Sequence, residues 1–245
     1  MARVKHNALH QYTGGVNNVP ANGPDLPFPT PGLQGWKWMY ETFADGILHT
    51  GDNVKYEETI LGSTPAPGIG ANGISLPTIA TDNTGSHIQH TTPQIILGAA
   101  TKKFYLETSI TLTAATMASN EMFVGFATDA TGSNHQADAG TSWTADNMIG
   151  FGKLDTATEM DFIARASDVE QVVGIGSTMT TAVRATLSCY YDGSNYNVYK
   201  DGALVAKSSQ EAIPQAVMGM SLFIKSGTGA IQTLLVNYLA LGTEL

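Results

Sequence analysis

Glu159 and Asp161 form the acidic pair whose spacing comes nearest to a catalytic pattern in this chain. Carboxylates two residues apart on a β-strand point to the same face, where one can attack a sugar ring while the other donates a proton. The surrounding segment EMDFIARAS has no further acid, and Glu107 is the only acid in the strand-like run 103–113. We therefore expect no glycoside hydrolysis and no enzymatic activity.

The segment 128–147 holds most of the remaining residues that could contact a ligand. Oxygen-rich loops can bind calcium, and a tryptophan beside acidic or amide groups can hold a sugar. The twelfth position counted from Asp129 is Gly140, so the segment is not an EF-hand loop. We predict a solvated or subunit-contact loop without a metal, and keep calcium as an alternative. The residues expected to contact a glycan or a subunit are Asp129, Asn134, His135, Asp138 and Trp143.

Other catalytic and cofactor motifs are missing from the sequence. None of the six histidines lies in a recognisable motif, and no Gly-x-Ser-x-Gly nucleophile elbow occurs. A Ser-His-Asp triad comes from separated positions, so sequence order alone leaves it open. The glycine-rich stretches 68–73 and 174–181 lack the lysine of a phosphate loop, which favours turns. We expect His87 and His90 at the surface or an interface rather than on a metal, and we expect no cofactor.

The composition restricts the class of protein. The chain has 245 residues, of which 42% are apolar and only 13% charged, and its net charge is −9. The basic residues form no stripe, so we expect no nucleic-acid partner. Cys189 is the only cysteine and is expected to be a buried thiol rather than part of a disulfide. Neither a secretory signal nor an apolar membrane span is visible, so we expect synthesis in a cytoplasm and no membrane partner.

Residues 1–35 differ from the rest of the chain. Pro20, Pro24, Pro27, Pro29 and Pro31 are half of its ten prolines, and they favour an extended, polyproline-like conformation. We predict an extended N-terminal arm over 1–35, in which Leu9, Tyr12, Leu26 and Phe28 dock on a neighbouring subunit. A frayed terminus is the alternative.

From Trp36 onward the pattern is that of β-strands. Trp36, Trp38 and Tyr40 alternate with other residues as in a half-buried strand, and core packing is favoured for them over a binding platform. The region 60–100 indicates long loops and short strands. Later strands are expected at 103–113, 121–128, 147–154, 160–167, 183–191, 196–202, 219–226 and 231–241. In the first of these, 103–113, we expect the alternation to break near Thr108. We predict an all-β domain over 36–245, either a sandwich or a barrel.

The stretch LSCYYDGSNYNVYKDGALVA, residues 187–206, predicts a β-hairpin. Leu187, Cys189 and Tyr191 share one strand face, Tyr196 and Val198 can face the same core, and Asp-Gly pairs favour tight turns. The stretch resembles the concanavalin A-like lectin/glucanase jelly roll, including laminin-G-type domains. The positions that carry the resemblance are Tyr191, Asp192, Gly193, Val198, Tyr199, Asp201 and Gly202.

The resemblance implies a two-sheet antiparallel jelly-roll sandwich over 36–245, preceded by the extended Pro-rich arm. Glucanases of this fold use a Glu-x-Asp-x-(x)-Glu pattern, of which Glu159 and Asp161 lack the third carboxylate. The low charge, the arm and the missing catalytic residues resemble decoration or cement proteins of tailed-phage heads. The expectation is a structural protein on the capsid exterior that binds the major capsid protein and forms a homotrimer. The alternative is a carbohydrate-binding, lectin-like module for receptor binding or adhesion.

Overall fold

The described part of the chain contains fifteen β-strands and no helix. The computed structural model describes residues 36–43, 56–70, 72–92, 95–98, 102–114, 120–128, 143–155, 157–167, 169–227 and 229–244. The arm predicted over 1–35, with Leu9, Tyr12, Leu26 and Phe28, lies outside these residues. No helix in the described ranges is long and apolar enough to cross a membrane. The expected all-β class is confirmed.

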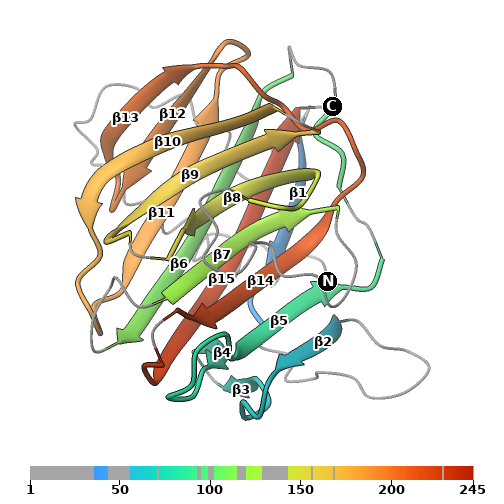
Figure 1. Ribbon diagram of the computed structural model, residues 1–245. Coiled ribbons are helices and arrows are strands. Elements are labelled where there is room, and N and C mark those ends of the chain that lie inside the picture. Colours follow the sequence, from blue (N-terminus) through green and yellow to red (C-terminus); the bar gives the residue numbers. More distant parts are fainter. Residues whose placement is uncertain are drawn as a thin grey trace, which may run out of the picture.

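The strands form two antiparallel sheets that pack face to face, with sheet B in front of sheet A in Figure 1. Sheet A has the order β13-β12-β11-β6-β15-β4-β3, and β1 also pairs with β15. Its strands are β1 (Trp36–Glu41), β3 (Gly68–Gly70), β4 (Gly73–Pro77), β6 (Phe104–Ala114), β11 (Ala185–Tyr191), β12 (Asn195–Lys200), β13 (Ala203–Ser209) and β15 (Gln232–Glu244). Sheet B has the order β10-β9-β8-β7-β14-β5-β2, with β2 (Tyr56–Leu61), β5 (Gly85–His90), β7 (Asn120–Ala127), β8 (Asn147–Lys153), β9 (Glu159–Ala166), β10 (Val169–Thr178) and β14 (Gly219–Ser226).

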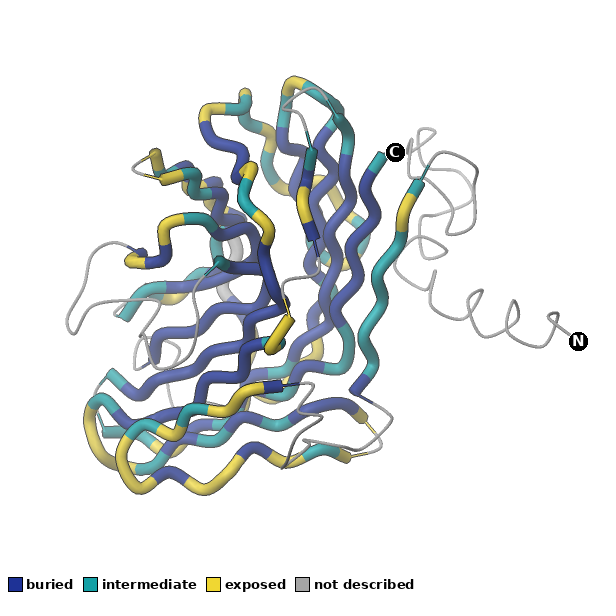
Figure 2. Tube along the Cα trace, turned by 90° about the vertical axis from the view of Figure 1, so that its right-hand side faces the viewer, coloured by how far each residue is buried: buried dark blue, intermediate teal, exposed yellow. Residues whose placement is uncertain are grey.

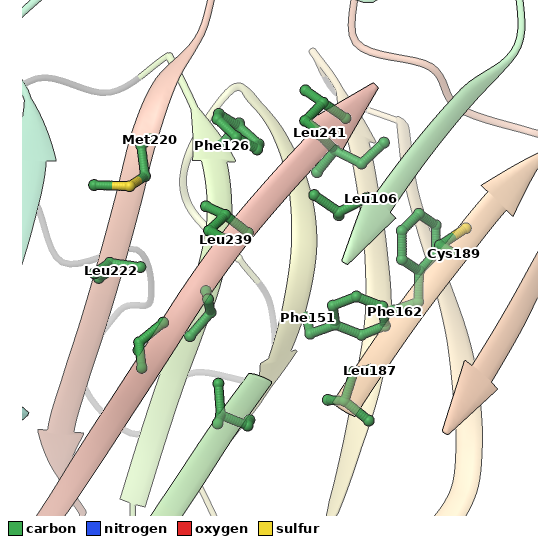
Figure 3. Close-up of a cluster of buried hydrophobic side chains, with 14 of the residues drawn as sticks. Leu106, Phe126, Phe151, Phe162, Leu187, Cys189, Met220, Leu222, Leu239 and Leu241 are labelled. Carbon is green, nitrogen blue, oxygen red and sulfur yellow. The ribbon is translucent and has the colours of Figure 1, made fainter. Parts of the chain in front are cut away.

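The core lies between the two sheets. Alternation along each strand gives every sheet one apolar face, and these two faces meet. Leu106 and Leu239 of sheet A lie in the same buried cluster as Phe126 and Phe151 of sheet B (Figure 3). In Figure 2 the buried residues run through both layers, and exposed residues gather in the connections and edge strands. The predicted sandwich is therefore confirmed.

The hairpin predicted within 187–206 is present. In β11 and β12, Tyr191 pairs with Tyr196, and both side chains are buried. The Asp192 carboxylate accepts hydrogen bonds from the backbone N–H groups of Ser194 at 2.9 Å and Asn195 at 2.7 Å, which closes the turn. Cys189 is buried in this hairpin, as expected.

Residues 36–98 contribute strands to both sheets. β1, β3 and β4 belong to sheet A, whereas β2 and β5 form one side of sheet B. β1 lies antiparallel to β15, so that Trp36 pairs with Glu244. The first and last described strands are therefore neighbours, and this pairing brings the β1 aromatics beside the middle of sheet A.

Two local predictions are wrong. A turn was expected at 174–181, but β10 runs through Val169–Thr178. Its pairing with β9 shifts after Gly174, and Gly176 has a positive φ of 64°, so a glycine bulge lets the strand continue. The alternation does not break at Thr108, since the irregularity lies in β15, where the Tyr238 carbonyl accepts the Thr108 hydroxyl at 2.8 Å.

The core position of Leu106 predicts a large loss of stability when it is truncated. Leu106→Ala should lower the free energy of unfolding by about 2–5 kcal/mol, because it removes packed atoms and leaves a cavity. Leu204→Ala, at an exposed position of β13, should change it by less than about 0.5 kcal/mol. Urea denaturation followed by tryptophan fluorescence measures both. Equal effects would contradict the placement of the core.

Candidate functional site on the outer face of sheet A

The outer face of sheet A is the side of that sheet turned away from sheet B. In β6, Leu106 faces the core, so its neighbours Tyr105 and Glu107 project to the outer face. Register brings Gly242 of β15 beside Tyr105, and Gly242 also pairs with Trp38 of β1. A Cβ at Gly242 would lie 2.8 Å from the Trp38 indole, so only glycine lets this ring lie flat over β15.

Glu107 occupies the middle of this face and is buried. Its carboxylate accepts hydrogen bonds from the hydroxyl of Tyr238 at 2.7 Å and from the hydroxyl of Tyr105. Burial raises the pKa of Glu107 above its usual value, and the two hydroxyl donors act in the opposite direction. Burial, followed by the charge of Glu107, raises the pKa of both tyrosines, which therefore remain hydrogen-bond donors.

Four half-buried aromatic residues flank Glu107 on one side, and we call them the edge aromatics: Trp36, Trp38, Tyr40 and Tyr238. The rings of Tyr40 and Tyr238 stack with centroids 5.6 Å apart, and those of Trp36 and Trp38 lie 6.3 Å apart. The Nε1 atom of Trp38 is buried and has no hydrogen-bond acceptor within the described part of the chain. Such an unused donor fits a site completed by another group.

Three tyrosines on the other side of Glu107 form what we call the tyrosine cluster: Tyr105, Tyr190 and Tyr199. Their exposed fractions are 1%, 4% and 5%, and Trp36 and Trp38 pack against them. They come from three adjacent strands, β6, β11 and β12. The outer face therefore holds a continuous aromatic surface with a carboxylate in its centre.

The described strands of sheet A pair no second carboxylate with Glu107, whose cross-strand neighbours are Ser188 and Ala240. Within the described strands of sheet A, the other acids are Glu41 and Glu244. Glu41 accepts the backbone N–H of Phe43 at 3.0 Å, and Glu244 accepts that of Lys103 at 3.2 Å. Half-buried aromatic rings held around a buried carboxylate offer apolar surface on which the apolar face of a polar ligand can lie.

The acidic pair considered in the sequence lies on the other sheet. Glu159 and Asp161 are half-buried in β9, and Asp161 lies near Gly174 of β10. Burial, and then the charge of Glu159, raises the pKa of Asp161. The neighbouring strand β8 carries no acid, and the β10 positions paired with Asp161 and Glu159 are Gly174 and Thr178, so the described strands on either side place no third carboxylate beside this pair.

Trp143 does not fit the contact role predicted for it. Only 2% of the residue is exposed, and its ring packs on Phe123 with centroids 5.8 Å apart. It also lies against Gly152, where a Cβ would come within 2.7 Å of the indole. The ring fills a small cluster on the outer face of sheet B. The other predicted contact residues, Asp129, Asn134, His135 and Asp138, lie outside the described residues.

His87 is buried rather than at the surface. Its Nε2 atom lies 3.0 Å from the Ser221 hydroxyl oxygen, and its ring meets Phe223 edge-on. His90, three residues later on the same strand, is half-buried against Tyr56. Positions three apart on a strand face opposite sides, so the two histidines do not converge on one ion. Within the described residues, no three His, Cys, Asp or Glu side chains gather as a metal site would require.

Buried charges lie at one end of sheet B. Lys225 and Glu121 form an ion pair of 3.0 Å, and both side chains are buried. The Lys153 ammonium donates to the backbone carbonyls of Asn120 and Leu154, the latter at 3.0 Å. Burial lowers the pKa of Lys153 to about 8, although the charges of Asp155 and Glu121 act in the opposite direction. We therefore expect the stability to depend on pH through Lys153.

Sequence reasoning missed the Glu107 site. Glu107 was noted only because its strand lacks a second acid, and Tyr238 was covered only by the strand expected at 231–241. Two local patterns were visible in the sequence. Tyr105 and Glu107 stand two positions apart in an otherwise apolar and hydroxyl-bearing run, and Trp36, Trp38 and Tyr40 also follow one another at a spacing of two. The pairing of β1 with β15 was the missing information, since it brings these two patterns together.

Comparisons with known proteins identify the fold. No family model matches the sequence, and the curated proteins contain no match. Among solved structures, the endo-1,3-beta-glucanase from Streptomyces sioyaensis is similar with 9% identity and a TM-score of 0.58, over 89% of this chain and 99% of that one. The botulinum neurotoxin serotype C1 binding domain is similar with 10% identity and a TM-score of 0.52, over 76% of this chain and 43% of that one.

A protein of unknown function from Shewanella oneidensis MR-1 is also similar, with 8% identity and a TM-score of 0.53, over 86% of this chain and 87% of that one. The chain thus spans less than half of the neurotoxin structure and most of the other two. Identities this low show the fold alone, a concanavalin A-like jelly-roll sandwich, which confirms that part of the resemblance. Nothing in these likenesses links the chain to a phage capsid, so that part stays a prediction.

The pKa of Lys153 predicts a pH-dependent stability. In the unfolded chain the amine keeps its proton up to the usual value of 10.5, whereas in the folded protein it releases the proton near pH 8. The free energy of unfolding of the wild type, relative to Lys153→Met, should therefore rise between pH 8 and 10.5, by up to about 3 kcal/mol.

Urea denaturation at several pH values measures this difference. Lys207→Met, at an exposed position, is the matched control and should show a difference from the wild type that stays constant over the same pH range. A constant difference for Lys153→Met as well would show that Lys153 is not buried as described.

Proposed function

We propose that the protein is a non-catalytic glycan-binding module whose site is the edge aromatics together with Glu107. The observation that carries this proposal is the placement of a buried, hydroxyl-bound carboxylate beside four half-buried aromatic rings on one sheet face. Among the similar structures, one is an endo-1,3-beta-glucanase, and another concerns botulinum neurotoxin type C, whose cell entry depends on interaction with two ganglioside molecules. These names support a sugar ligand for a protein of this fold.

Sugar binding on this face would use the half-buried rings. A pyranose ring has an apolar face of C–H groups that can lie on the indole of Trp36 or Trp38, and hydroxyls around its rim. Glu107 is buried and accepts the hydroxyls of Tyr105 and Tyr238, so its part in the site would be to hold these rings in place rather than to touch the sugar. Single sites of this kind are shallow, so tight attachment would come from several copies acting together.

The positions of the acidic residues favour sugar binding without hydrolysis. Glu107 has no second carboxylate within reach on the described strands of its own sheet, since Glu41 and Glu244 bind backbone N–H groups. Retaining and inverting glycosidases need two carboxyl groups on either side of the scissile bond. A lone carboxyl can orient a sugar but cannot serve as both acid and base.

Trp38→Ala tests the glycan site. On an array that includes β-1,3-glucan oligosaccharides and ganglioside headgroups, the full chain should bind at least one glycan, and Trp38→Ala should weaken that binding by about tenfold or more. Ile231→Ala, at an exposed position, is the matched control and should bind as the wild type does. Thermal unfolding checks that each variant is folded. No signal on the array, or equal binding by Trp38→Ala, would refute the proposal.

A second candidate function is the decoration or cementing of a phage head, and the surface at one edge of the sandwich favours protein contact of this kind. Edge strands β10 and β13 lie together, because the Gln171 side chain donates to the Ser209 carbonyl at 2.6 Å. Four apolar side chains of these two strands are exposed, with Val172 on the outer face of sheet B and Leu204 on that of sheet A: Val169, Val172, Leu204 and Val205. Exposed apolar patches mark interaction sites more often than isolated apolar residues do.

This second function predicts binding to the capsid lattice. The full chain should cosediment with expanded empty heads, and the double variant Val172→Asp, Leu204→Asp should bind at least about tenfold more weakly, because it places charge in an apolar contact. The control is Lys207→Asp, which also adds negative charge to β13 but lies at a polar position. Failure of the wild type to bind heads would refute the decoration role and leave the glycan proposal unaffected.

A further inference from the structure

Glu107 lies at the centre of a hydrogen-bond network that joins three strands of sheet A. Its Oε1 atom accepts the hydroxyl of Tyr238 at 2.7 Å, and its Oε2 atom accepts the hydroxyl of Tyr105. Each tyrosine is in turn hydrogen-bonded to a second hydroxyl group, Tyr105 to Ser188 and Tyr238 to Thr186. β6 carries Tyr105 and Glu107, β15 carries Tyr238, and β11 carries the serine and the threonine. One acid thus connects two chains of hydroxyl groups.

The direction of these hydrogen bonds depends on the charge of Glu107. An ionised carboxylate can only accept, so both tyrosine hydroxyls must donate to it. When a proton from the solvent binds one carboxylate oxygen, that oxygen becomes a donor, and the tyrosine that faces it must accept instead. The hydroxyl proton of that tyrosine then has to point at another acceptor. The carboxylate and the carboxylic acid therefore require different arrangements of the network.

We propose that Glu107 is a pH switch for the edge aromatics: protonation of its Oε1 atom releases Tyr238 and weakens glycan binding. This inference rests on the glycan-binding function proposed above and makes Glu107 a positioning residue of that site. Tyr238 is half-buried, whereas only 1% of Tyr105 is exposed, so Tyr238 is the ring with room to turn. Because its ring stacks on that of Tyr40 with centroids 5.6 Å apart, a turn of Tyr238 changes the surface offered to a sugar.

Burial sets the direction in which this switch works. It raises the pKa of Glu107 above the usual value of 4.5, because the charged form is penalised away from water, while the two hydroxyl donors act in the opposite direction. The ionised form is present above this raised pKa and is lost as the pH falls through it. The site should therefore bind a glycan at neutral pH and release it in acid.

Within the described strands packed around Glu107, no other charged side chain faces the network. Lys37 and Glu41 of β1 alternate with the outward-facing aromatic residues, so they project to the opposite side. Glu244 lies at the end of β15, where its carboxylate accepts a backbone N–H group. β11 carries no charged residue, and burial raises the pKa of its Tyr190, which stays protonated. Among the groups of the network, Glu107 is thus the one whose charge changes in acid.

NMR on the full chain tests the switch without any ligand. With carbon-13 in the glutamate carboxyl groups and the tyrosine rings, the carboxyl resonance that is missing in Glu107→Gln should titrate with a midpoint above 4.5. The ring resonance of Tyr238 should move with the same midpoint, and in Glu107→Gln it should stay in place between about pH 7 and about pH 4. A midpoint at or below 4.5, or a Tyr238 resonance that moves equally in Glu107→Gln, would overturn the proposal.

Tyr238→Phe provides a second variant, which decides the question even where Glu107→Gln does not fold. It keeps the ring that stacks on Tyr40 and removes the hydroxyl that donates to Glu107. Since this hydrogen bond lowers the pKa of Glu107, its loss should move the carboxyl midpoint to higher pH. An unchanged or lower midpoint would contradict the role given to Tyr238.

Glycan binding at two pH values tests the consequence for the site. Affinity for the glycan with the strongest array signal should be about fourfold or more weaker at about pH 4 than at about pH 7, because Glu107 is then roughly three-quarters or more protonated. Glu107→Gln should bind weakly at both values. Glu57→Gln, at an exposed position of β2, is the matched control and should lose as much affinity in acid as the wild type.

The two measurements separate the switch from the function on which it rests. Equal wild-type affinity at both pH values would refute the regulation and leave glycan binding intact. Absence of glycan binding at any pH would refute the proposed function, and the NMR titration would still decide whether Glu107 moves Tyr238.

Discussion

The hydrogen bonds that the hydroxyls of Tyr105 and Tyr238 donate to Glu107 are the interaction on which the candidate site depends. A buried carboxylate without partners is costly, and hydrogen bonds to a charged group contribute about 1.5–3 kcal/mol each. These two bonds tie the ring of Tyr105, on the same strand as Glu107, and the ring of Tyr238, on the neighbouring strand β15, to one carboxylate. The rings in turn support Trp38, which tilts against Tyr105, and Tyr40, which stacks on Tyr238. One buried acid thus orders the surrounding aromatic surface.

The outer faces of the two sheets differ in how they are filled. On sheet B, the ring of Phe123 lies over Gly125 and Gly150, where a Cβ on either glycine would come within 2.8 Å of it. Trp143 closes the same face over Gly152, and the cluster has no exposed aromatic edge. On sheet A, the edge aromatics stay half-buried around a polar centre. The glycines of β7 and β8 therefore allow these rings to pack closely, and the half-buried aromatic residues lie on the other sheet.

Sequence reasoning succeeds where a signal is local. The Asp-Gly turns, the alternation in β11 and β12 and the buried Cys189 follow from residues a few positions apart, so hairpin, sandwich and core face were predictable. It fails where distant strands must meet. Trp36 and Tyr105 are separated by most of the first hundred residues, and only the pairing of β1 with β15 makes them neighbours. For Trp143 the local signal itself pointed the wrong way. A tryptophan that lies among polar residues in the sequence can still be buried in a small apolar cluster.

Fluorine NMR on the protein with all three tryptophans replaced by fluorotryptophan tests the central claim, that the aromatic face of sheet A is the ligand-binding surface. The three resonances separate Trp36 and Trp38 on that face from Trp143 on sheet B, which serves as an internal control. Titration with the glycan that gives the strongest array signal should shift the resonances of Trp36 and Trp38 and leave that of Trp143 in place. A shift of Trp143 alone, or no shift at any tryptophan under saturating glycan, would contradict the account.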